Sequence, residues 1–169
     1  MNFIKNVALS AFLTIGAFGA VMYTSCNKDE CKDVTCLNGG TCSGGNCVCT
    51  TGYEGINCET AMRTKFIDSW TASDMEVGGA AIPTYTGIIT GGTAITDVRI
   101  ANFSDDFFVN DVLASVQGNT ITIAYQEPDN DDYRVSGNGT YNPVDGKITW
   151  TYTLTNPSNV TISYTGTWQ

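Results

Sequence analysis

The stretch ITWTYTLT, residues 148–155, alternates four apolar side chains with four threonines. The apolar positions are Ile148, Trp150, Tyr152 and Leu154. Successive side chains of a β-strand point to opposite faces, and β-branched residues suit a pleated surface. The stretch therefore predicts a half-buried antiparallel strand with one apolar face and one threonine face in water.

The same period of two recurs before and after this stretch. Residues 160–168, VTISYTGTW, repeat it after an Asn-Pro-Ser-Asn turn, and weaker strand patterns cover 65–71, 82–90, 95–103, 107–116, 120–126 and 133–141. Short segments rich in Gly, Asn, Asp and Pro separate them, as expected of hairpin turns. Because every connection is short, we predict an all-β, eight-stranded antiparallel meander over residues 61–169. An up-and-down barrel is the preferred closure, and a β-sandwich is the alternative.

Residues 31–58, CKDVTCLNGGTCSGGNCVCTTGYEGINC, hold six of the seven cysteines. This segment, the cystine module, has too few apolar side chains to fold on a hydrophobic core, so it needs covalent cross-links. Disulfides persist in oxidising compartments, which indicates an exported protein. Six cysteines allow many connectivities, and their spacing alone does not choose among them.

Three motifs in the cystine module match one family: CLNGGTC (36–42), CVC (47–49) and GYEGINC (52–58). The segment resembles the EGF-like (epidermal-growth-factor-like) domain over its whole length. The resemblance implies the pairs Cys31–Cys42, Cys36–Cys47 and Cys49–Cys58. It also implies a rigid spacer or protein-contact element.

Before the module, Lys5 and an apolar run over residues 7–23 are typical of a secretory signal. A permanent membrane helix is the alternative, although the run is short for a span. The residues Thr24-Ser25 before Cys26 resemble a lipobox, with Tyr23 in place of the usual leucine. The resemblance implies that Cys26 carries the lipid that anchors the chain in a membrane. The alternative is a free or intermolecularly paired thiol.

The charged residues after Cys26 have two interpretations. Lys28, Asp29 and Glu30 resemble the signal that exports lipoproteins of one Gram-negative group to the exterior of the outer membrane. Asn27, Asp29 and Glu30 also resemble the ligand segment of calcium-binding EGF domains, whose oxygens suit a hard cation. The segment 43–46 lacks the aromatic that this second pattern needs. We therefore predict a surface-export signal and no cofactor, with calcium as the alternative.

Six rings on the strands are candidate ligand contacts: Trp150, Tyr152, Tyr164, Trp168, Tyr133 and Tyr141. They could line a cavity for an apolar or sugar ligand, or fill an interior that eight strands leave barely wide enough for side chains. The early Trp70, the meander and the closing aromatic strand resemble lipocalin-like domains, although Asp68-Ser69-Trp70 stands where lipocalins have GxW. The acidic segment 127–132 is either a calcium loop or a solvated turn.

Composition disfavours nucleic-acid binding and excludes catalysis by a histidine-activated nucleophile. Eight Lys and Arg against 17 Asp and Glu give a net charge of −9, which disfavours nucleic acid as a partner. The chain has no histidine, so Ser-His and Cys-His nucleophile pairs are impossible.

We divide the chain into a signal peptide (1–25), a lipidated tether (26–30), an EGF-like domain (31–58) and a β-barrel-like domain (61–169). The sequence predicts a non-enzymatic outer-membrane surface lipoprotein that binds a protein or glycan. The alternatives are a lipocalin-like carrier of a small apolar ligand and a carbohydrate-active enzyme that uses two carboxylates.

Overall fold

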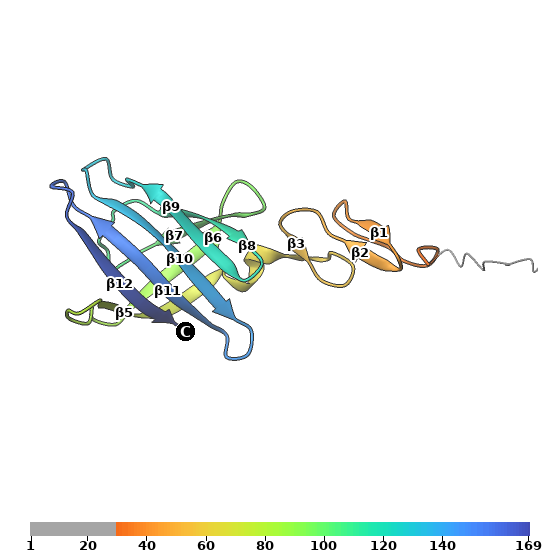
Figure 1. Ribbon diagram of the computed structural model, residues 1–169, viewed down its shortest axis with the longest axis horizontal. Coiled ribbons are helices and arrows are strands. Elements are labelled where there is room, and N and C mark those ends of the chain that lie inside the picture. Colours follow the sequence, from red (N-terminus) through yellow and green to blue (C-terminus); the bar gives the residue numbers. More distant parts are fainter. Residues whose placement is uncertain (1–29) are drawn as a thin grey trace, which may run out of the picture.

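The computed structural model describes residues 30–169. A short, disulfide-linked segment extends from one end of a β-barrel, so this part of the chain is elongated (Figure 1). The elements before the barrel are β1 (Thr41–Ser43), β2 (Asn46–Val48), β3 (Tyr53–Glu54), β4 (Thr60–Ala61) and the 3-10 helix η1 (Met62–Lys65). The barrel strands are β5 (Asp68–Glu76), β6 (Tyr85–Gly91), β7 (Asp97–Ala101), β8 (Val112–Gln117), β9 (Thr120–Gln126), β10 (Arg134–Asn142), β11 (Lys147–Thr155) and β12 (Thr161–Trp168).

The eight strands β5 to β12 form a closed antiparallel barrel within residues 30–169. Each strand pairs with the next along the chain, and β12 returns to pair with β5, with Trp168 opposite Ala72. The predicted all-β, up-and-down barrel is confirmed. The sandwich alternative is excluded because the ring of paired strands has no open edge.

Strand boundaries follow the prediction most closely in the second half of the barrel. Strand β9 has its predicted limits, and β10, β11 and β12 differ from theirs by one residue. Strand β5 was expected over 65–71, but it begins at Asp68 because η1 occupies the preceding turn. Strand β8 was expected from residue 107, and it begins only at Val112.

The cystine module is a small hairpin structure held by the three disulfides of the described chain. They join Cys31 to Cys42, Cys36 to Cys47 and Cys49 to Cys58. Disulfide bonds were expected, and this is the pairing that the family resemblance implied. No helix within residues 30–169 has the length and apolar character needed to cross a membrane.

The module and the barrel are joined by more than the connecting chain. Strand β3 of the module pairs with β4, which leads directly into η1 at the barrel. Gly52 is buried with φ +91°, and a Cβ there would stand 2.5 Å from the Ile95 side chain. Glycine is needed here for two reasons. A Cβ would collide with Ile95, and other residues avoid this backbone conformation.

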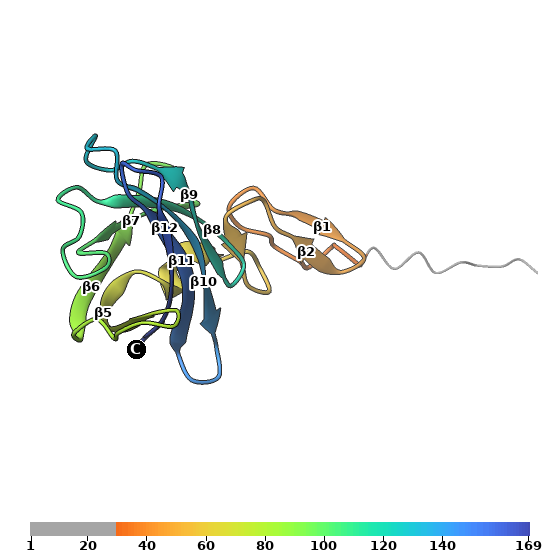
Figure 2. The same cartoon turned by 60° about the vertical axis from the view of Figure 1, so that its left-hand side comes forward.

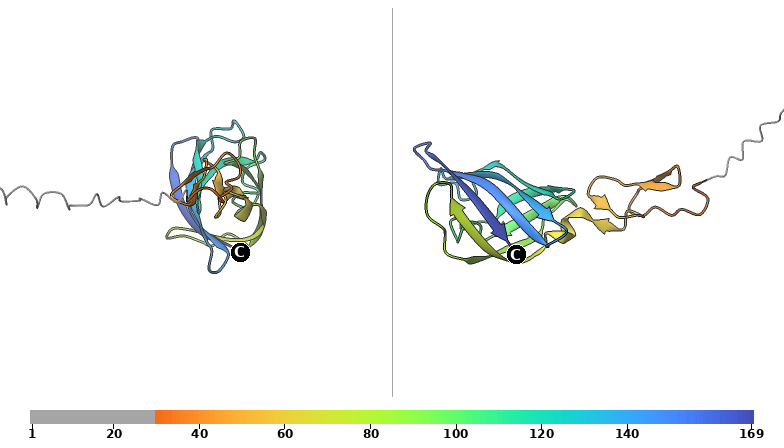
Figure 3. Two further views of the ribbon diagram at one scale, coloured as in Figure 1. Left: turned by 90° about the vertical axis from the view of Figure 1, so that its right-hand side faces the viewer. Right: turned by 60° about the horizontal axis from the view of Figure 1, so that its bottom comes forward.

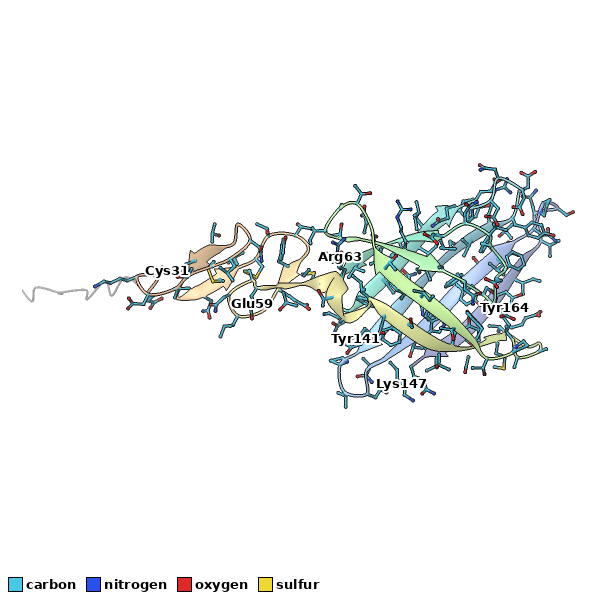
Figure 4. The ribbon with its side chains drawn as sticks, turned by 180° about the vertical axis from the view of Figure 1, so that it is seen from behind. Cys31, Glu59, Arg63, Tyr141, Lys147 and Tyr164 are labelled. Carbon is cyan, nitrogen blue, oxygen red and sulfur yellow. A yellow bond between two sulfur atoms is a disulfide. The ribbon has the colours of Figure 1, made fainter. Side chains whose placement is uncertain are left out.

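Two basic side chains of η1 add polar contacts at this junction. The Arg63 guanidinium donates to two carbonyl oxygens of the β6–β7 connection and to that of Asp97 at the start of β7, at 2.8–3.2 Å. Lys65 Nζ lies 2.8 Å from Glu54 of the module and 2.8 Å from Asn119 Oδ1 of the β8–β9 turn. Figure 4 labels Arg63 where the two parts meet. The module is therefore docked on one end of the barrel.

Candidate functional site

The interior of the barrel is filled by aromatic rings. Trp150 and Trp168 have no exposed surface and Tyr152 has 1%, so these three predicted ligand contacts are buried in the core. Phe103, from the β7–β8 connection, packs among all three, with ring centroids 4.8–5.8 Å away. The interior is therefore packed with side chains. The Trp150 Nε1 donor has no hydrogen-bond partner in the described chain.

The other three predicted rings keep some exposed surface. Tyr164 is half-buried and stacks on Tyr152, with ring centroids 5.1 Å apart. Tyr141 packs edge-on against Phe66 at the module end, 5.8 Å between centroids. Tyr133 is 36% exposed in the β9–β10 connection. The structure therefore separates the six rings into a buried group of three and three rings with exposed surface, of which Tyr164 contacts the buried group.

A buried carboxylate, which the sequence analysis did not identify, lies beside the central rings. Asp74 on β5 is 2% exposed. Its Oδ2 accepts hydrogen bonds from the hydroxyls of Tyr85 (2.6 Å) and Tyr152 (2.9 Å), and its Oδ1 accepts one from Trp168 Nε1 (3.1 Å). A Cβ on Gly166, opposite Asp74 in β12, would overlap Oδ1, so glycine makes room for the carboxylate.

The tyrosines of this network are held as neutral donors. Burial, followed by the neighbouring Asp74 charge, raises the pKa of both the Tyr85 and the Tyr152 hydroxyl far above the ordinary value. The Ser104 amide donates to the Tyr85 oxygen at 3.0 Å, and its hydroxyl lies 3.2 Å from that of Tyr152. The network therefore joins β5, β6, β11 and β12 to the β7–β8 connection.

A glycosidase needs two carboxylates facing each other across a substrate. Among residues 30–169, Asp74 is the one buried Asp or Glu. Its three donors and the overlying rings leave no approach for a sugar. The interior therefore does not supply the pair that the enzyme alternative requires.

The β7–β8 connection, residues 102–111, closes the barrel end opposite the module. Phe103, Ser104 and Phe108 are buried in it. Ser104, Asp105 and Asp106 are consecutive non-glycine residues with φ of 56–60°. This left-handed turn costs roughly 1–2 kcal/mol per residue. The buried contacts of Phe103 and Ser104 offset that cost and hold the loop in place.

Four connections form the end of the barrel away from the module. Because β5 starts beside the module, the connections after β5, β7, β9 and β11 lie opposite it (Figures 2 and 3). These far-end loops are residues 77–84, 102–111, 127–133 and 156–160. Figure 4 places Tyr164 toward this end and Cys31 at the opposite extreme of the described chain.

The acidic segment 127–132 is folded around donors of the protein. Asp129 accepts the amides of Val109 and Asn110, both at 2.8 Å, and thereby ties the second far-end loop to the third. Burial acts to raise the pKa of Asp129, but the hydrogen bonds from Asn110 and Val109 outweigh it, so the pKa lies below the ordinary value. Glu127 pairs with Arg134 at 3.5 Å.

The two tied loops expose apolar side chains that sequence periodicity had placed in strands. Val109 is 93% exposed, Phe107 is 42% exposed, and the Phe107 ring lies 5.4 Å from that of Tyr133. We call Phe107, Val109 and Tyr133 the far-end patch. A hollow of about 430 Å³ adjoins it, with Val109, Leu113, Arg99 and Pro128 in its lining.

The hollow continues along the outer wall of the barrel. A second hollow of about 390 Å³ shares Arg99, Leu113 and Gln126 with the first. It lies where β8 and β9 separate: their pairing ends at Ser115 opposite Thr122. Beyond that point, the Gln126 amide side chain bonds both the amide and the carbonyl of Leu113, in place of a strand neighbour.

The predicted lipidation site Cys26 and the residues Asn27, Lys28 and Asp29 lie outside the described residues, and Glu30 is the first described residue and is exposed. Both predictions for this segment stay predictions. A comparison of the chain with known protein families found no match. The candidate site is therefore defined by its geometry alone: the far-end patch and its adjoining hollow on a filled barrel.

Proposed function

We propose that the chain is a non-enzymatic surface lipoprotein of a Gram-negative outer membrane, anchored through Cys26 and facing the cell exterior. In this proposal the cystine module is an EGF-like spacer. It holds the barrel away from the membrane and presents the barrel to a protein or glycan partner.

One observation carries this proposal: the module docks on one end of the barrel and the candidate site lies at the other. The contacts of Arg63 and Lys65 resist bending at the junction, because they tie η1 to the barrel and to the module. The disulfides stiffen the module itself. A partner approaching from outside the cell would meet the far-end loops first.

The filled interior supports binding on the outside of the barrel. Rings that have no exposed surface cannot touch a ligand unless the barrel rearranges, whereas Val109 and Phe107 are already accessible. Such an exposed apolar group beside a hollow is typical of an interaction site.

The anchor is tested by replacing Cys26 with alanine. Metabolic labelling with a fatty-acid analogue should mark the wild-type chain and leave Cys26→Ala unlabelled. Equal labelling of both chains would refute the lipoprotein assignment.

Surface display is tested on the tether. Replacing Lys28, Asp29 and Glu30 together by alanine should keep the lipid and protect the chain from protease added to whole cells. A matched control replaces the exposed Lys32 and Asp33 of the module by alanine. If the tether variant is digested as fast as the control, the export signal lies elsewhere.

A further inference from the structure

The charged side chains of the far-end loops are all acidic. Loop 102–111 contributes three carboxylates and loop 127–133 contributes four, while none of the four far-end loops contains Lys or Arg. Arg134, at the start of β10, is paired with Glu127 and Asp132. A surface of this kind attracts cations and repels anionic partners.

The apolar part of the surface lies within this acidic frame. The Asp129 hydrogen bonds hold Val109 at the rim of the 430 Å³ hollow, and Phe107 and Tyr133 stand beside it on the same two loops. A single exposed apolar side chain is ordinary on a protein surface, but several on two tied loops beside a hollow form a contiguous site.

The hollow itself has mixed polarity. Leu113 and Pro128 supply apolar wall, and the lining also includes two carboxylates, Asp111 and Glu127, and one base, Arg99. No residue of the described chain forms a salt bridge or hydrogen bond with the Arg99 side chain, which leaves its donors available for a carbonyl oxygen of a bound chain.

We infer that the far-end patch is a docking site for a basic polypeptide that presents an apolar side chain to the hollow, with its Lys or Arg residues beside the acidic loops. The inference rests on the proposed display function and names the class of its partner. Acidic loops steer the approach, and the apolar side chain supplies the contact that holds the complex.

The chain contains a matched pair of valines that tests this inference. Val109 is 93% exposed at the far end, and Val144 is 91% exposed in the β10–β11 connection at the module end. Because both side chains are almost fully in water, serine at either position should leave the fold intact.

The probe is a labelled peptide of alternating lysine and leucine, titrated against the full chain by fluorescence anisotropy. Val109→Ser should weaken its binding by about tenfold, the effect expected of one contact residue, and Val144→Ser should leave it unchanged. Replacing Asp105 and Asp106 by asparagine should slow association, whereas Asp145→Asn at the module end should not.

Two further peptides separate the contributions of charge and apolar contact. A lysine–serine peptide of equal charge should bind weakly, and a glutamate–leucine peptide should not bind. Equal effects of Val109→Ser and Val144→Ser, or equal binding of the lysine–serine peptide, would overturn the inference, because non-specific charge would then explain the binding. Neither result would affect the labelling test of the anchor, so the two proposals fail separately.

Discussion

Gly166→Ala should destabilise the barrel through Asp74. The new Cβ would overlap Oδ1, the atom that accepts the Trp168 hydrogen bond at 3.1 Å. The carboxylate must then move, and the two tyrosine bonds to Oδ2 are disturbed with it. A hydrogen bond to a charged group contributes about 1.5–3 kcal/mol, so we expect a loss of about 2–4 kcal/mol in the free energy of unfolding.

A double-mutant cycle isolates this cause. In an Asp74→Ala background no carboxylate opposes the methyl group, and alanine in a strand is favoured over glycine by about 0.5–1 kcal/mol. Gly166→Ala should therefore be neutral or slightly stabilising there, a coupling of about 3 kcal/mol. Asp74→Ala should itself cost about 3–5 kcal/mol, because it leaves three buried donors without their acceptor, at roughly 1–3 kcal/mol each.

The assay is urea unfolding followed by tryptophan fluorescence, since Trp70, Trp150 and Trp168 all lie in the barrel. With a slope of about 1–3 kcal/mol per molar urea, Gly166→Ala should lower the midpoint by about 1–2 M in the wild-type background only. An equal loss in both backgrounds would refute the argument, because the glycine would then be needed for its backbone and not for the carboxylate.

Three other predictions follow from the same structure. At about pH 11 the Tyr85→Phe and Tyr152→Phe variants should show the phenolate absorbance of the wild type, because neither raised-pKa hydroxyl ionises while folded; a lower absorbance in either variant would contradict this. Because the pKa of Asp129 is lowered by folding, its bonds stabilise the loops above the ordinary carboxyl pKa and are lost as pH falls through the folded value. The Val109 and Asn110 amide NMR shifts should follow that titration, and in Asp129→Asn they should not. Reduction of the three disulfides should unfold residues 31–58 and leave the barrel's tryptophan transition within a few degrees, and a larger shift would show that module and barrel unfold as one unit.

The sequence predicts the barrel best where a strand has one apolar and one wet face. Strand β11 alternates buried and exposed residues along most of its length, which is the period that residues 148–155 display. Strand β5 was misplaced because its inward positions include Asp74, which interrupts the apolar period. The donors that satisfy Asp74 lie 11, 78 and 94 residues away, so no local pattern could identify it as a core residue.

The candidate site was less predictable for a similar reason. Residues 104–106 were expected to form a turn, and they do, but periodicity placed Phe103 and Phe107 in the flanking strands. The connection is longer than expected, and within it Phe103 is buried while Phe107 is 42% exposed. Asp129, which bonds the Val109 amide, comes from another loop, and a search for alternating residues does not connect the two.

Because the barrel has an even number of strands, one of its ends can carry the module while the loops of the other end vary. Hairpins alternate between the two ends, so changes of length in a far-end loop leave the module junction untouched. The loops 77–84, 127–133 and 156–160 contain no buried residue, whereas 102–111 contains three. Loop 156–160 is therefore the one most open to randomisation as a recognition loop. Loop 127–133 holds loop 102–111 through Asp129, Ile82 of loop 77–84 packs against the core, and loop 102–111 is fixed by its own buried residues.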